Sequence, residues 1–169
     1  MAPSAVDASV GRLAGQLDEI ARLVRFEPAL LDRQSARVSR WTIGLQLDHI
    51  LKVLEVGQKA LAGARAPLPR GVNLTGRIVL ALGWFPRGVA KSPERVLPEE
   101  QSPAVLAART SELRRVFCET PLDEAIYADP RPVFPHPVFG GLTALQSLRF
   151  LALHTHHHLR IVADIRRST

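Results

Sequence analysis

Hydrophobic and polar residues follow the period of an α-helix in four long stretches of the sequence. These stretches cover residues 6–26, 41–62, 102–119 and 143–167. Within each stretch, apolar residues recur three or four positions apart and polar or charged residues fill the positions between them, which is typical of a helix with one buried face. The pattern therefore predicts four long amphipathic helices.

The residues in front of three stretches are those that commonly start helices. Ser39, Ser102 and Thr143 are hydroxyl residues suited to the N-cap position, and Pro103 fits the first turn of the helix that follows Ser102. Thr143 and Gln146 have the spacing of a capping box, in which each side chain accepts a hydrogen bond from the other residue's backbone N–H. The start of the last helix is therefore the most sharply predicted.

A fifth, shorter stretch at residues 72–84 is apolar on more than one side and predicts an additional buried helix. Its apolar residues include Ile78, Val79, Leu80 and Leu82. Strand-like alternation never extends beyond four residues, and residues 87–101 and 120–141 are rich in proline and turn residues, so both are expected to be loops. The predicted fold is all-α, a four-helix bundle with an additional short helix, whose helix order and handedness stay open.

The composition fits one globular domain covering residues 1–169. Hydrophobic residues make up 46% of the chain, an ordinary value, and the single cysteine, Cys118, excludes a disulfide scaffold and a cysteine-based zinc knuckle. We interpret Cys118 as a small core residue. The N-terminal residues lack the pattern of a secretory signal, and the longest apolar run, residues 78–85, is far shorter than the roughly 20 residues of a membrane span. A soluble, cytoplasmic protein with no membrane partner is expected.

The chain is basic, with a net charge of +6 and an isoelectric point near 10.6, and nearly all of its basic residues are arginines. These arginines are spread along the sequence without a block of like charge, and few aromatic residues accompany them that could stack on bases. A solvated surface explains this distribution better than a nucleic-acid interface does. No nucleic-acid partner is expected.

Four of the six histidines, His154, His156, His157 and His158, fall within five residues of the last predicted helix. At 100° per residue, one arc of this helix about 100° wide collects its inward-facing residues. They are Leu151, His154, His158, Ile161, Val162 and Ile165. His156 lies on the opposite side and His157 on the flank. The spacing of His154 and His158 places their imidazoles on successive turns, where both can bind one metal ion.

Zinc-type sites need three or four ligands, so a third ligand should come from another helix. His49 is the histidine of the second predicted helix and lies on its apolar face. A single histidine on such a face is usually a hydrogen-bonded core residue, but facing helices of a bundle commonly build metal sites from inward-facing ligands. We therefore predict a divalent metal ion bound by His49, His154 and His158. Asp48 points to the far side of its helix and is not counted as a ligand.

Several other residues are candidates for the surroundings of the ion. For His157, a packing or surface role is favoured over a donor to a ligand or an alternative ligand. For His136, held between two prolines, a structural role in the loop is favoured over a role in a pocket. Gln46 and Tyr127 are further candidate pocket residues, and His156 should be solvated.

Three neutral imidazoles leave a divalent ion its full charge and at least one open position, the arrangement of catalytic sites. Zinc, nickel, manganese and iron all suit imidazole ligands. A water bound there would have its pKa lowered to about 7, and a bound thiol would deprotonate. Other routes to a nucleophile lack their residues, since the sequence has no GxSxG elbow, no glycine-rich phosphate loop and no histidine beside Cys118.

Three segments together resemble a known family: Trp41-Thr42 leading to Asp48-His49-Ile50, then HPVFGGLT, then LRFLALHTHHHLR. They are similar to the DinB-like, or YfiT-like, metal-dependent superfamily, in particular to its branch with an HPxFG segment before an HxxHH helix. The resemblance covers most of the chain. It implies an up-down-down-up four-helix bundle, often a homodimer, with a divalent ion held by one histidine of the second helix and two of the last, here His49, His154 and His158.

Two classes of function remain, and the resemblance suggests the first. In the first, the protein is an enzyme whose ion activates a low-molecular-weight thiol, such as bacillithiol or mycothiol, for transfer, isomerisation or conjugation on a small molecule, or activates water for hydrolysis. In the second, it is a metal-binding or stress-associated bundle without turnover. An open coordination position facing a pocket distinguishes the first class, whereas a fourth protein ligand would indicate the second. DNA binding, suggested only by the net charge, ranks last.

Overall fold

A computed structural model describes residues 4–62, 68, 70–85, 92–119 and 124–168. Four long helices dominate it: α1 (Ala5–Phe26), α2 (Ile43–Ala62), α4 (Pro103–Arg114) and α6 (Ala144–Arg167). A π-helical turn, η3 (Arg115–Glu119), extends α4 to the length that the sequence predicts. Short 3-10 helices, η1 (Pro28–Leu30) and η2 (Glu94–Val96), lie in the connections before α2 and before α4.

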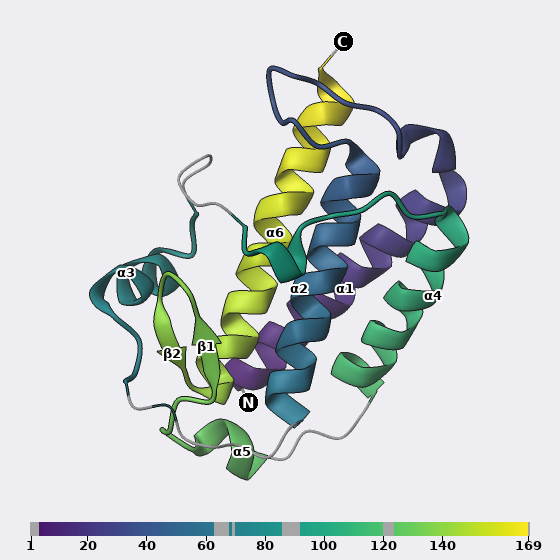
Figure 1. Cartoon of the computed structure of the whole chain (residues 1–169). Coiled ribbons are helices and arrows are strands. Elements are labelled where there is room, and N and C mark those ends of the chain that lie inside the picture. Colours follow the sequence, from purple (N-terminus) through teal and green to yellow (C-terminus); the bar gives the residue numbers. More distant parts are fainter. Residues whose placement is uncertain (1–3, 63–67, 69, 86–91, 120–123, 169) are drawn as a thin grey trace.

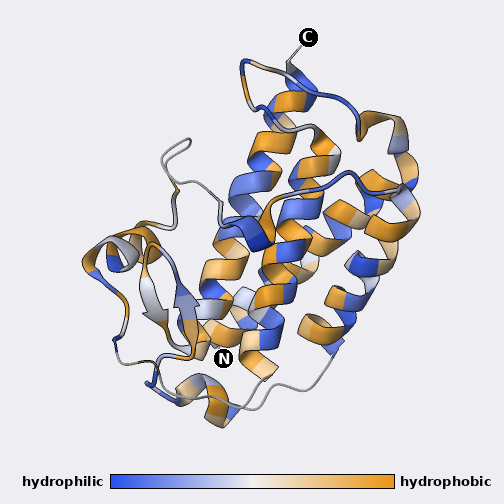
Figure 2. Cartoon of the chain, in the orientation of Figure 1, coloured by the Kyte–Doolittle hydropathy of each residue, from blue (hydrophilic) through white to orange (hydrophobic). Residues whose placement is uncertain are grey.

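The four long helices form a bundle in which α1 and α6 run in one direction and α2 and α4 run in the other (Figure 1). In chain order the topology is therefore up-down-down-up, and α2 packs against α4 and α6 while α1 packs against the same two helices. Hydrophobic and hydrophilic residues alternate along the long helices (Figure 2), and the buried hydrophobic residues form one core. The all-α bundle predicted from the sequence is confirmed.

Leucine and isoleucine side chains fill the bundle and hold α2 close to α6. Leu47, Leu51 and Leu54 of α2 and Leu148 and Leu151 of α6 have no exposed surface. Removing such side chains from water provides most of the favourable free energy of folding, at about 25 cal/mol per Å² of apolar surface. The histidines that share these helix faces are therefore held by a close-packed core. None of the described helices is both long and apolar enough to cross a bilayer.

The predicted helix starts are mostly confirmed. Thr143 and Gln146 form the capping box of α6, and the Ser102 hydroxyl accepts the Val105 backbone N–H at the start of α4. The prediction for Ser39 is wrong, because α2 begins later, at Ile43, where the hydroxyl of Thr42 accepts the N–H of Leu45.

The short helix α3 (Leu74–Leu82) lies beside the bundle and contacts α6. Its N-cap is Asn73, and Gly83 ends it in the left-handed conformation that glycine adopts without a steric penalty (φ 66°). Val79 and Leu80 are buried, but Ile78 and Leu82 are 49% and 71% exposed. The expectation that this helix is buried on more than one side is therefore wrong, because only one of its faces packs against the bundle.

Residues 120–141 are not the loop that the sequence predicts, although residues 120–123 lie outside the described part. They contain the short helix α5 (Glu124–Ala128) and strand β1 (Phe134–His136), which pairs antiparallel with β2 (Gly140–Leu142). Strands of three residues are too short to show an alternation of polar and apolar positions. The prediction of no strand is therefore wrong for this hairpin, which lies beside α3 (Figure 1).

Candidate metal centre

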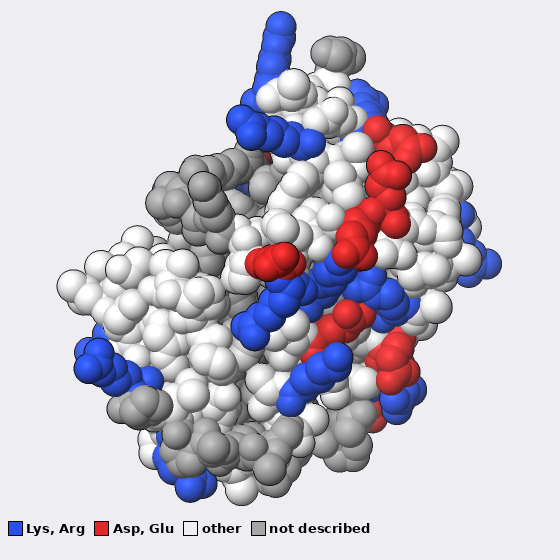
Figure 3. All heavy atoms as spheres, in the orientation of Figure 1, with Lys and Arg blue, Asp and Glu red and all other residues white. Residues whose placement is uncertain are grey.

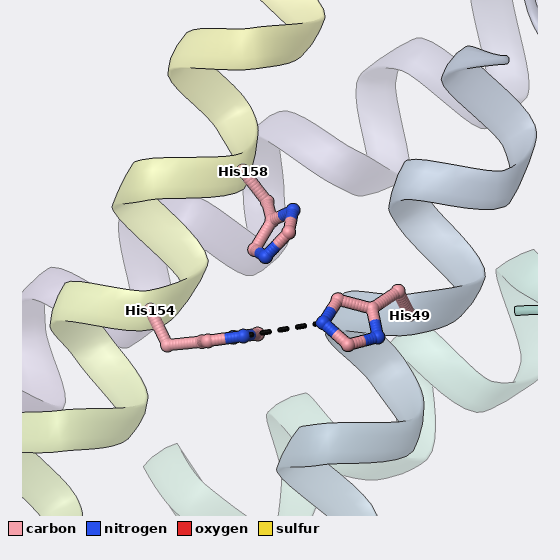
Figure 4. A group of neighbouring side chains, drawn as sticks. All are labelled: His49, His154 and His158. Atoms are coloured by element: carbon pink, nitrogen blue, oxygen red, sulfur yellow. Dashed lines mark hydrogen bonds between the residues drawn. The ribbon is translucent and has the colours of Figure 1, made fainter. Parts of the chain in front are cut away.

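Three histidine side chains point toward one another in the space between α2 and α6 (Figure 4). His49 comes from α2, and His154 and His158 come from successive turns of α6. One ring nitrogen from each lies within 4.8 Å of the others, and no further His, Cys, Asp or Glu of the described residues joins this group. The structure thus brings together the three side chains that the sequence predicts as ligands; their binding of an ion stays a prediction.

Hydrogen bonds fix the orientation of two of the three rings. Nδ1 of His49 lies 2.7 Å from the carbonyl oxygen of Val96, so Nδ1 carries the proton and donates it. Nδ1 of His158 likewise donates to Oε1 of Gln46 at 2.7 Å. The Gln46 amide donates in turn to the Ser39 hydroxyl at 2.9 Å. Both rings therefore carry their lone pair on Nε2, the nitrogen that would bind a cation, as outer hydrogen bonds arrange in metal-bound histidines.

The spacing of the nitrogens fits ligands of one ion. Nε2 of His49 and Nε2 of His154 are 3.3 Å apart. Two nitrogens bound to one tetrahedral ion at about 2.0–2.1 Å would lie about 3.3–3.4 Å from each other. Nε2 of His154 can donate to the Nε2 lone pair of His49 across this distance (dashed line in Figure 4), whereas Nδ1 of His154 is buried and has no hydrogen-bond partner among the described residues. The donor set and its spacing fit a divalent ion that accepts imidazole nitrogen.

Burial keeps these imidazoles neutral. Desolvation lowers the pKa of His49 below its ordinary value, although the Val96 carbonyl and Asp48 oppose the shift. Desolvation also lowers the pKa of His154 and of His158 strongly, and positive charge on the neighbouring histidines would lower both further. A metal ion at neutral pH would therefore not have to displace protons from the three rings.

The three histidines form part of the wall of a cavity of about 870 Å³. Trp41 lies against two of them, with ring centroids 5.0 Å from His49 and 6.3 Å from His158. Phe85 and Phe150 border the cavity beside His154. Ligand sites typically have volumes of about 300–1,000 Å³ and mostly apolar walls, so a small molecule could reach an ion bound here.

His136 at the end of β1 combines the two roles that the sequence left open. Its Nδ1 accepts the backbone N–H groups of Val138 and Phe139 at 3.2 and 3.1 Å, which holds the turn between the strands. Its ring also borders the cavity and stacks on Phe139, with centroids 4.2 Å apart. Burial, together with the positive charge of Arg95, lowers the pKa of His136 to about 4, so the ring is neutral at physiological pH.

The other candidates divide between the cavity and the rest of the molecule. His157 borders the cavity and packs edge-on against His158, with ring centroids 5.1 Å apart. Gln46 is at the cavity wall, as predicted, and Tyr127 on α5 is not among its described lining residues. His156 is exposed, as the helix geometry predicts.

Sequence reasoning missed the buried charge cluster on the other side of α2. Asp48 lies outside the group of three histidines, has no exposed surface and pairs with Arg109 of α4. Arg109 also binds Glu55, two turns further along α2, at 2.7 Å. Charged side chains of both signs gather on the face over α2 and α4 (Figure 3). The sequence signal was the i, i+7 pair of acids on α2, but their partner could be identified only once α4 was placed beside them.

In a comparison with known protein families, the chain matches the DinB superfamily over residues 14–162. This range includes all three histidines of the site and all four long helices except the ends of α1 and α6. No curated protein and no solved structure matches the chain significantly.

Proposed function

The chain belongs to the DinB superfamily, and from this premise we propose that it is a metal-dependent enzyme acting on a small molecule. His49, His154 and His158 bind one divalent ion, and the ion activates a thiol or a water molecule for transfer or hydrolysis. One observation carries the proposal: the three imidazoles converge at the wall of a cavity that can hold a second reactant.

Within the part of the chain that the structure describes, no fourth protein ligand joins the three histidines, and this favours catalysis over a purely structural site. Structural zinc sites are closed by four protein ligands, whereas catalytic sites keep a position for water or substrate. Among the described residues, only the three histidines come together. The cavity beside them gives a reactant access to the position that they leave open.

The chain's own residues would prepare the site in three ways. A divalent ion on three neutral imidazoles supplies a positive charge that lowers the pKa of a coordinated thiol or water, so that a nucleophile forms near neutral pH. Val96 and Gln46 hold the rings of His49 and His158 with their Nε2 lone pairs inward. Trp41 and Phe85 present apolar surface at the cavity and reduce the access of bulk water to the reactants.

Zinc, nickel, manganese and iron each suit this donor set, and a low-molecular-weight thiol such as bacillithiol or mycothiol is the proposed co-substrate. A non-catalytic role is the second candidate, favoured by the position of the histidines. Because His49 is on α2 and the other two are on α6, a bound ion would crosslink the two helices and stabilise the bundle.

The test measures turnover in the metal-loaded protein. The protein is incubated with cellular thiols and a panel of electrophiles, and loss of free thiol is followed over time. The expected result is catalytic loss of thiol, or hydrolysis of an ester or amide in the same panel, that disappears in His158→Ala and persists in His156→Ala. Metal binding without turnover of any compound would favour the non-catalytic role.

A further inference from the structure

The cavity beside the three histidines has an aromatic wall. Phe85, Phe134, Phe139 and Phe150 all border it, and their rings contact one another with centroids about 6 Å apart. Clustered aromatic rings of this kind bind the apolar body of a ligand, most favourably when the ligand itself carries a flat or branched apolar group.

The charged groups at the cavity are all basic. Arg40 and Arg95 border it, and none of the described residues around it is an aspartate or a glutamate. On the face seen in Figure 3, acidic side chains lie over α2, α4 and the segment before α4, and none is visible over α3 and the hairpin. A cavity with apolar walls and charge of one sign attracts a ligand of the opposite sign.

Arg95 is available to such a ligand. It belongs to η2, its side chain is exposed, and it forms no ion pair with any residue in the described part of the chain. Arg95 and His136 both border the cavity, and the positive charge of Arg95 lowers the pKa of the His136 ring in addition to the larger effect of burial. A guanidinium in this situation can bind a carboxylate through two parallel hydrogen bonds.

His136 adds a neutral hydrogen-bond donor. Its Nδ1 accepts two backbone N–H groups, so the proton of the neutral ring is on Nε2, at the opposite edge. No described residue accepts this N–H. The ring borders the cavity, and the hydrogen bonds at Nδ1 together with the stacked Phe139 fix its orientation.

We infer that the cavity binds a small organic acid, with its apolar body on the four phenylalanines and its anionic group on Arg95 and the Nε2–H of His136. Arg95 precedes Val96, the residue whose carbonyl orients His49. The acid would thus be anchored beside the histidines and would present the remainder of the molecule to them. Binding of the acid does not depend on the proposed function; only its role as the substrate of the enzyme rests on that function.

The test compares three probes of nearly equal shape: 4-phenylbutyrate, 4-phenylbutanamide and 4-phenylbutylamine. Their affinities are measured by isothermal titration calorimetry, both with the metal-loaded protein and after treatment with a chelator. We expect the acid to bind about ten-fold more tightly than the amide, and the amine to bind most weakly, in both forms of the protein.

Variants assign the preference to the two residues. In Arg95→Gln the affinity for the acid should fall about ten-fold while the affinity for the amide stays unchanged. Arg12 is an exposed arginine of α1, and Arg12→Gln is the control, because it changes the net charge equally and should leave both affinities unchanged. In His136→Asn, which keeps an acceptor for the two backbone N–H groups, the acid should lose about five-fold.

Equal affinities for the acid and the amide, or a preference unchanged in the Arg95 and His136 variants, would overturn the inference. So would a preference that appears only with metal bound, because the ion itself would then hold the acid, while the proposed metal function would survive. If the chain binds no metal but keeps its preference for the acid, the proposed function fails and the inference stands.

Discussion

The carbonyl oxygen of Val96 lies 2.7 Å from Nδ1 of His49, although the two residues are 47 positions apart. The segment around Val96 is held against α2 by the residues on either side of His49 in that helix. Asp48 accepts the backbone N–H of Glu99 at 2.8 Å, and Lys52 donates to the carbonyl of Leu97 at 2.8 Å. The orientation of a candidate ligand thus depends on how firmly α2 holds one connecting segment.

The first prediction concerns Lys52. In Lys52→Met the hydrogen bond to Leu97 is lost while most of the apolar side chain remains, so the Val96 carbonyl should be held less firmly. Metal affinity should fall about ten-fold, the lower end of the effect usual for residues that orient a metal-bound histidine. Competition with a chromogenic chelator measures this. Lys59→Met, an exposed lysine of the same helix, is the control, and equal affinities of the two variants would contradict the prediction.

The second prediction concerns the three histidines themselves. His154→Ala and His158→Ala should each abolish stoichiometric metal, and His49→Ala should weaken binding by orders of magnitude, because the ion would keep only two protein ligands. His156→Ala should have little effect, since this side chain is exposed on the opposite side of α6. Elemental analysis of the purified variants decides the matter. An unchanged metal content in the His49 and His158 variants would refute the assignment.

The helices and the three histidines could be predicted because their signals are local and periodic. The i, i+4 spacing of His154 and His158 and the position of His49 on an apolar face follow from helix geometry once the helices are assigned. Packing α2 against α6 then brings the three side chains together. Nothing in this reasoning requires knowledge of the loops.

The surroundings of the site could not be predicted because they depend on contacts between distant segments. The Val96 carbonyl is a backbone group, which the sequence does not distinguish from any other. Asp48 belongs to the polar side of α2 by its position in the helix, but Arg109 of α4 and the backbone of Glu99 lie against it, and it is buried. The place of His136 at the cavity depends on a hairpin whose three-residue strands leave no pattern in the sequence. Tyr127 was a candidate for the pocket, but it is not among the described residues that line the cavity.

The third prediction concerns the burial of Asp48. Asp48→Ala removes a partner of Arg109 and leaves the Glu99 N–H without its acceptor. Breaking a buried ion pair on one side commonly costs about 3–5 kcal/mol of folding free energy. Because Arg109 keeps its pair with Glu55, the loss should lie at the lower end, about 3 kcal/mol. Urea denaturation measures the loss. As a control, Glu112→Ala breaks an exposed pair with Arg115 on α4 and should not change stability measurably. Equal losses in the two variants would contradict the prediction.

The fourth prediction concerns the pH dependence contributed by His136. The folded protein keeps this ring neutral, with a pKa of about 4, whereas in the unfolded chain the ring has the ordinary pKa of 6.5. Between these values the unfolded state binds more protons, so the wild-type protein should lose stability as the pH falls from about 6.5 toward 4. At pH 5 this contribution should be on the order of 1–2 kcal/mol, reduced from the full shift because the ring is partly exposed.

His136→Asn isolates this contribution, because the other histidines titrate alike in both proteins and cancel in the comparison. The asparagine carbonyl can still accept the N–H groups of Val138 and Phe139, so the turn should persist. Urea midpoints at pH 7.5 and pH 5 should therefore differ less for the variant than for the wild type. Equal losses of stability in the two proteins would contradict the prediction, because they would mean that His136 gains its proton as readily in the folded state as in the unfolded chain. In that case the ring would not stay a neutral hydrogen-bond donor at the cavity.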